Sequence, residues 1–138
     1  MKYLIALLLI MPYYVRGQAQ DSLQASSVKL TTREKPKFPG GEEELRKFLA
    51  LNLRYPNDAL QHGVEGEVIV SFKIDEEGNI SDVRSLKKIG YGCDEEAIKV
   101  VKKMPQWIPA KKDGKKIAVT YNLPIEFELP KQSSNDPK

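Results

Sequence analysis

Several residue types on which binding sites and cross-links depend are scarce in this sequence. There is one cysteine and one histidine among 138 residues. A single cysteine excludes an intramolecular disulfide framework and a cysteine-rich zinc site, because both need several sulfur atoms. A single histidine, His62, excludes metal sites built on histidine pairs and acid–base catalysis by two histidines. The chemistry open to the chain is therefore narrow.

An excess of charge of one sign is also missing. The 22 basic and 19 acidic residues are interleaved and leave a net charge of +3. A protein that grips phosphate backbones needs a stronger basic excess, so we expect no nucleic-acid partner. Hydrophobic residues make up 41% and charged residues 30% of the chain, which is typical of a soluble globular domain. The length allows one such domain.

The N-terminal segment predicts export. A positively charged start precedes an apolar run over residues 3–15, and small residues, Gly17 and Ala19, stand before a cleavage site after Ala19. This layout is typical of a secretory signal peptide over residues 1–19, with cleavage after Gly17 as the alternative. A membrane-spanning helix needs about 20 apolar residues, and Pro12 interrupts this run. An uncleaved short anchor in the inner membrane is the competing interpretation, and membrane contact is expected only in that case.

Composition divides the rest of the chain into three parts. Residues 20–37 and 131–138 are polar, which predicts a flexible lead-in and a polar tail. The folded domain is expected over residues 38–130.

Helices are predicted in two places. Three acidic residues open an amphipathic segment that runs from residue 42 to Tyr55-Pro56, where proline ends it. Residues 56–61 predict one more short helical turn. Residues 94–103 have acids first and lysines last, and an apolar stripe between them, which predicts a second main helix.

Three strands are predicted from alternating apolar residues. The first covers residues 68–74 and turns through 75–79, where Gly78 supplies a positive φ angle. The return strand, 80–89, alternates irregularly, which indicates a bulge, although its spacing also fits a helix. The last strand, 117–129, contains Pro124 and should therefore be an edge strand over at least part of its length.

The order of these elements predicts an α+β fold with the topology αββαβ. A hairpin followed by a right-handed helical crossover places the third strand beside the first. We expect a three-stranded sheet in the order 2-1-3 with both helices on one face.

No group of residues predicts catalysis. His62 has Asp58 and Glu65 nearby, but one histidine at a helix end is better explained as a surface residue. Cys93 precedes a helix, yet the only base available to activate it is His62. We expect Cys93 to be a small buried residue and Trp107 to be a buried anchor. The sequence predicts a protein that is not an enzyme and that needs no metal or cofactor.

An ordered set of short motifs resembles the carboxy-terminal domain of the TonB family. Tyr55-Pro56 and G-V-E-G-E-V at residues 63–68 resemble its start, and M-P-Q-W-I-P-A at 104–110 resembles its central segment. L-P-I-E-F at 123–127 resembles its closing strand. The positions that carry the likeness and are expected to be structural are Tyr55, Pro56, Gly66, Gly78, Pro105, Trp107, Pro109, Gly114, Pro124 and Phe127.

The resemblance implies a periplasmic energy-transducer domain. Such a domain binds a short peptide, the TonB box of an outer-membrane receptor, by strand addition, which agrees with an exposed last strand. The candidate edge consists of Lys116, Ile117, Ala118, Val119, Thr120, Tyr121 and Asn122. The competing interpretation is a soluble envelope protein that binds peptidoglycan, another envelope protein or a second copy of itself as a homodimer, without energy transduction.

Overall fold

The computed structural model of the protein describes residues 30–131. The expected signal peptide, most of the lead-in and the tail from residue 132 lie outside the described residues. A compact unit begins at Thr32 and contains all the helices and strands discussed below. Within residues 30–131, no helix combines the length and the apolar character needed to cross a membrane.

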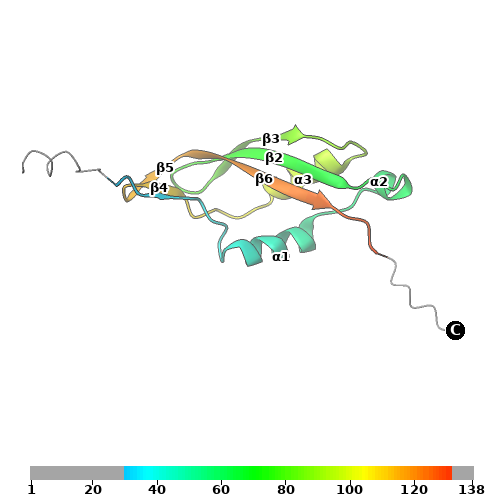
Figure 1. Ribbon diagram of the computed structural model, residues 1–138, viewed down its shortest axis with the longest axis horizontal. Coiled ribbons are helices and arrows are strands. Elements are labelled where there is room, and N and C mark those ends of the chain that lie inside the picture. The colour runs from blue at the N-terminus through cyan, green and yellow to red at the C-terminus, as the bar shows by residue number, and fades with distance from the viewer. Residues whose placement is uncertain (1–29, 132–138) are drawn as a thin grey trace, which may run out of the picture. The chain divides into compact units, whose positions relative to one another are not determined.

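The larger of two sheets is antiparallel and has the order β3-β2-β6 (Figure 1). β2 (Gly66–Ile74) lies in the centre, β3 (Ile80–Lys87) returns beside it, and β6 (Val119–Phe127) pairs with its other side from Gly66↔Phe127 to Ile74↔Val119. The fold is α+β, as expected, and this sheet has the arrangement that the crossover argument predicts for the three strands.

β3 is irregular, as its broken alternation indicates. Its register against β2 shifts twice, between Ile69 and Val70 and between Ser71 and Lys73. Asp82 adopts a positive φ of 50°, which is rare for residues other than glycine. The bulges leave β3 poorly suited to pair with a further strand.

The β2–β3 turn is built around one carboxylate. Oδ1 of Asp75 accepts hydrogen bonds from the N–H groups of Glu77 and Asn79 at 2.9 and 2.8 Å. The N–H of Asp75 donates to the carbonyl of Asn79 at 3.0 Å. Gly78 has a φ of 89°, which confirms the expected glycine turn.

Helices cover one face of this sheet. α1 (Glu42–Asn52) and α3 (Cys93–Lys102) are the two main helices, and α2 (Asn57–Gln61) is a single short turn behind Pro56. Even-numbered residues of β2 and odd-numbered residues of β6 alternate inward and join helix residues in one core. The core residues from these elements are Leu45, Val68, Val70, Phe72, Ile74, Ala97, Val100, Val101, Leu123, Ile125 and Phe127.

A second, smaller sheet was not expected. β1 (Arg33–Glu34), β4 (Ala110–Lys112) and β5 (Lys115–Ile117) form it in the order β1-β4-β5. β4 and β5 are joined by a tight turn, in which Asp113 and Gly114 have φ angles of 51° and 78°. The sequence did not predict the pairing of β1 with β4.

Two sequence expectations change as a result. The folded part begins before residue 38, because β1 pairs with β4 and Lys37 forms an isolated bridge with Ile108. The last strand is not continuous from 117 to 129. Ile117 pairs with Ala110, whereas Val119 pairs with Ile74, and the chain changes partner at Ala118. Both differences come from long-range pairing, which local alternation does not report.

Trp107 is the buried anchor that the sequence predicts. Its side chain is 3% exposed and lies 5.6 Å from Phe72 and 5.1 Å from Tyr121 between ring centroids. Phe38 meets it edge to face at 5.7 Å. This aromatic cluster joins the segment before α1 to β2 and β6, and aromatic pairs of this geometry add to the energy of burial.

Candidate functional site

The outer edge of β6 is the more regular of the two edges of the larger sheet. β6 pairs with β2 on one side and is the last strand of the sheet within the described residues. The opposite edge strand is the bulged β3. A strand edge with unpaired N–H and C=O groups is a template for a further strand.

The hydrogen bond that the N–H of Asp75 donates shows which backbone groups point outward. This N–H faces the β3 side, because its acceptor is the carbonyl of Asn79. Backbone direction alternates along a strand, so odd-numbered β2 residues face β3 and even-numbered ones face β6. Their partners in β6 are odd-numbered, such as Phe72↔Tyr121 and Val70↔Leu123. The even-numbered residues of β6 therefore direct their backbone groups to the free edge.

Pro124 supports the same assignment. It lies within the ladder opposite Ile69 and has no N–H to donate. Proline is accepted in a sheet where its nitrogen faces away from the neighbouring strand. Because 124 is even, its nitrogen faces the free edge. The outward N–H donors of β6 are consequently those of Thr120, Asn122 and Glu126.

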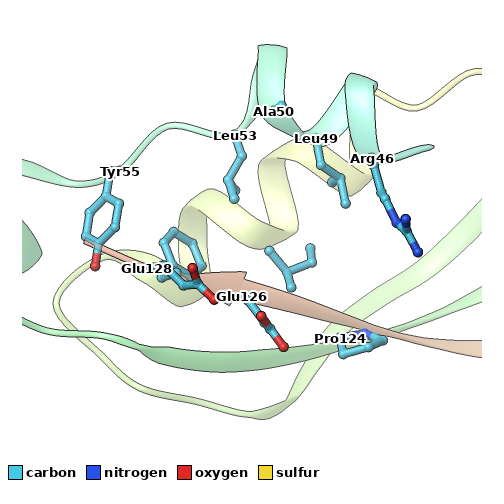
Figure 2. Close-up of a pocket in the computed structure, with 10 residues that line it drawn as sticks. Arg46, Leu49, Ala50, Leu53, Tyr55, Pro124, Glu126 and Glu128 are labelled. Atoms are coloured by element: carbon cyan, nitrogen blue, oxygen red, sulfur yellow. The ribbon is translucent and has the colours of Figure 1, made fainter. Parts of the chain in front are cut away.

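A groove runs between this edge and α1. Its volume is about 670 Å³, and its lining combines one face of α1 with the second half of β6 and the residue after it. Figure 2 shows Leu49 of α1 and Leu53, the residue after α1, extending toward β6, with Arg46 near Pro124 at one end and Tyr55 at the other. An added strand would therefore meet an apolar wall on one side.

The structure divides the sequence-predicted edge residues between two sheets. Lys116 and Ile117 belong to β5 and pair with β4, and Ala118 lies between the strands. The remaining residues, Val119, Thr120, Tyr121 and Asn122, form the first half of β6. The groove lies beside the second half, which the sequence analysis did not include. Pro124 was the available signal, because it marks that half as an edge.

Cys93 and His62, the two residues considered for catalysis, do not form a common site in the structure. The side chain of Cys93 is fully buried, and burial raises the pKa of its thiol, which opposes formation of a nucleophilic thiolate. His62 is exposed and lies next to Asp58 and Tyr91. Residues 30–131 hold no group of three or more side chains placed to bind a metal ion.

Several positions of the family motif have clear structural roles. Tyr55 donates a hydrogen bond from its hydroxyl to the carbonyl of Val64 and packs edge to face on Phe127, the last residue of β6. Pro56 precedes the first residue of α2, and Gly66 is the first residue of β2. These residues fix the path from α1 into the centre of the sheet.

The central motif holds the crossover against the hairpin. The N–H of Trp107 donates to the carbonyl of Gly78 at 2.9 Å. A Cβ atom on Gly78 would lie 1.8 Å from the carbonyl oxygen of Trp107. Pro105 follows α3, and Pro109 leads into β4. Gly114 forms the β4–β5 turn.

The profile described as "Gram-negative bacterial TonB protein C-terminal" matches residues 52–129. The chain belongs to this family. TonB C-terminal domains are associated with TonB-dependent transport and are not enzymes. No curated protein shows a significant sequence match to the chain.

A solved TonB C-terminal domain shares the fold. An NMR solution structure of the Helicobacter pylori TonB-CTD has a TM-score of 0.50 and 25% identity over 64% of this chain and 92% of that chain. A second NMR structure of the same domain has a TM-score of 0.48 and 25% identity over 66% of this chain and 86% of that one.

Proposed function

We propose that this TonB C-terminal domain works in the periplasm, where it binds an extended peptide of a TonB-dependent outer-membrane receptor by strand addition to the free edge of β6. The observation that carries the proposal is the edge itself. β6 offers outward backbone groups at even positions, whereas the opposite edge of the sheet is bulged. Backbone pairing supplies affinity in this mode, and alternate side chains supply specificity.

The groove gives the added strand a second contact. Leu49 and Leu53 lie above the edge, and burying their apolar surface under a peptide side chain is favourable by about 25 cal/mol per Å². The proposal therefore moves the binding site along β6, from residues 116–122 toward the whole of Val119–Phe127. A signal peptide over residues 1–19 would deliver the domain to the periplasm.

Titration of the isotopically labelled domain with TonB-box peptides tests the proposal. We expect the amide resonances of Thr120, Asn122 and Glu126 to shift most, because their N–H groups gain acceptors. Leu49 and Leu53 methyl resonances should shift with them. If the β6 amides do not respond to any TonB-box peptide, the proposed function is wrong.

A further inference from the structure

The two ends of the β5–β6 edge carry opposite charge. We define the basic end as Arg33, Lys111, Lys112, Lys115 and Lys116, and the acidic end as Glu65, Glu67, Glu126 and Glu128. The basic end belongs to the smaller sheet, beside the start of β6. The acidic end lies where β6 finishes and β2 begins, and its four residues line one shallow hollow.

The fold concentrates charge at the basic end. Strand pairing sets Arg33 opposite Lys112, Lys111 opposite Lys116, and Lys112 opposite Lys115, and it sets one acidic residue, Glu34, opposite Lys111. Like charges in directly opposite positions repel one another. Glu34 and Asp113 are the acidic residues of these strands and their turn. No salt bridge involves the five basic residues among residues 30–131.

Like charges also lie opposite one another at the acidic end, and they repel. Glu67 lies directly opposite Glu126 in the β2–β6 ladder. Its compensation is partial. The N–H of Leu129 donates a hydrogen bond to Oε1 of Glu65 at 2.7 Å. Lys87 Nζ lies 3.7 Å from Glu67, and Arg46 shares the groove with Glu126 and Glu128, although its nearest carboxylate is that of Glu42 at 4.0 Å. A ligand that places the opposite charge beside each end would therefore reduce the electrostatic repulsion there.

The segment between the two ends has no charged residue. It runs from residue 117 to residue 125 and reads I-A-V-T-Y-N-L-P-I. At about 3.3 Å per residue it separates the ends by nearly 30 Å. The Debye length is about 8 Å at physiological ionic strength, so each end acts on its own part of a bound peptide.

We propose that the edge selects its peptide by charge order. The preferred peptide carries acidic side chains beside the basic end, uncharged residues along β6, and basic side chains beside the acidic end. The inference rests on the proposed function, since it describes the peptide that strand addition would favour. It also fixes peptide direction, because only one orientation places both ends correctly.

Spin-labelled peptides test this order on the wild-type domain. Three peptides share one uncharged centre and blocked termini: one has an acidic and a basic end, one has two acidic ends, and one has two basic ends. A nitroxide on the acidic end of the first should broaden amides of residues 116–120. A nitroxide on its basic end should broaden amides of residues 124–128.

Affinity gives an independent measure. At low salt we expect the two mismatched peptides to bind roughly three- to tenfold more weakly, as fits exposed charge pairs. The difference should vanish near 1 M salt, where the Debye length is about 3 Å. In a variant with Lys115→Glu, Lys116→Glu, Glu126→Lys and Glu128→Lys, the net charge of the basic end falls from +5 to +1 and that of the acidic end rises from −4 to 0. The preference for the first peptide over the two mismatched ones should therefore be lost. All four side chains are exposed, so the variant should fold.

The outcomes separate the two proposals. Equal affinity for all three peptides at low salt, or broadening of both ends by either label, overturns the charge order and leaves strand addition intact. Absence of any β6 amide response contradicts strand addition and the charge order together. A response that depends on protein concentration without peptide assigns the edge to a second copy of the chain, and also overturns the inference.

Discussion

At the scale of single residues, Gly78 and Asp75 decide whether the β2–β3 hairpin can form its turn. Gly78 has a positive φ and lies against the backbone of Trp107, so it meets both a conformational and a steric requirement. Asp75 holds the same turn through its carboxylate. The hairpin and the crossover segment therefore depend on Gly78 and Asp75, neither of which is a hydrophobic core residue.

Gly78→Ala should destabilise the protein by more than about 3 kcal/mol. The new Cβ would add a backbone clash at 1.8 Å to the roughly 1–2 kcal/mol cost of a left-handed conformation. Gly114→Ala is the matched control, because Gly114 has a φ of 78° and open space around it. Urea denaturation followed by Trp107 fluorescence measures both. Equal losses would show that the contact with Trp107 is unimportant.

Asp75 should make the stability depend on pH in the acid range. Backbone hydrogen bonds to the carboxylate lower the pKa of Asp75 below its usual value of 3.8, and the largest contribution comes from the N–H of Asn79. A lowered folded-state pKa contributes stability above the unfolded value, and this contribution is lost as pH falls through the folded value. Asp75→Asn keeps an acceptor but removes the titration. Its urea midpoint should fall less than that of the wild type between pH 5 and pH 2. Parallel curves would contradict the prediction.

At the scale of elements, β6 has two kinds of residue in alternation along one strand. Odd-numbered residues direct their backbone N–H and C=O groups to β2, and Leu123, Ile125 and Phe127 among them are buried in the core. Even-numbered residues direct their backbone groups to the free edge. Stability and binding thus depend on alternate residues of the same segment.

Proline substitutions should separate these two roles. Asn122→Pro removes an outward donor and should abolish peptide binding with little loss of stability, whereas Asn122→Ala should keep most binding. Tyr121→Pro removes a donor to β2 and should cost about 3 kcal/mol or more, beyond the loss from Tyr121→Ala. Amide titrations and chemical denaturation measure the effects. Unfolding by Asn122→Pro and not by Tyr121→Pro would reverse the assignment of the edge.

The sequence predicts the regular elements well because local signals mark them. Gly78 marks the hairpin, and the acids and lysines of residues 94–103 mark α3. Three features were not predicted. β1 has two residues, too few for a periodic pattern, and Ala118 has no local signal for a change of partner. The α1–β6 groove depends on where α1 packs, which its own sequence does not specify. Pro124 alone pointed to that half of the edge.

At the scale of the whole molecule, the smaller sheet extends the domain toward the N-terminus. Thr32 and Asp113 are joined by two hydrogen bonds, at 2.8 and 3.0 Å, and Lys37 and Ile108 by two more, at 3.0 and 2.8 Å. These contacts tie the segment before α1 to β4 and to the crossover. The domain therefore includes part of what composition alone assigns to a lead-in.

Truncation should locate this boundary. A chain that begins at Phe38 loses β1 and the Lys37–Ile108 bridge, and we expect it to be less stable by about 2 kcal/mol than a chain that begins at Leu30. The amides of Lys111 and Lys112 should exchange faster with solvent in the shorter chain. Chemical denaturation and hydrogen exchange check both effects. Equal stability of the two chains would restore the boundary at residue 38.

The unequal edges of the larger sheet limit how far it can grow. If two copies met through their β6 edges, the only strands left at the rims of the combined sheet would be two copies of β3. Each carries two register shifts and a residue with a positive φ, so neither offers a regular template. Edge-to-edge association is thus self-terminating, and the same bulges that disturb the hairpin protect the domain against polymerisation into fibrils.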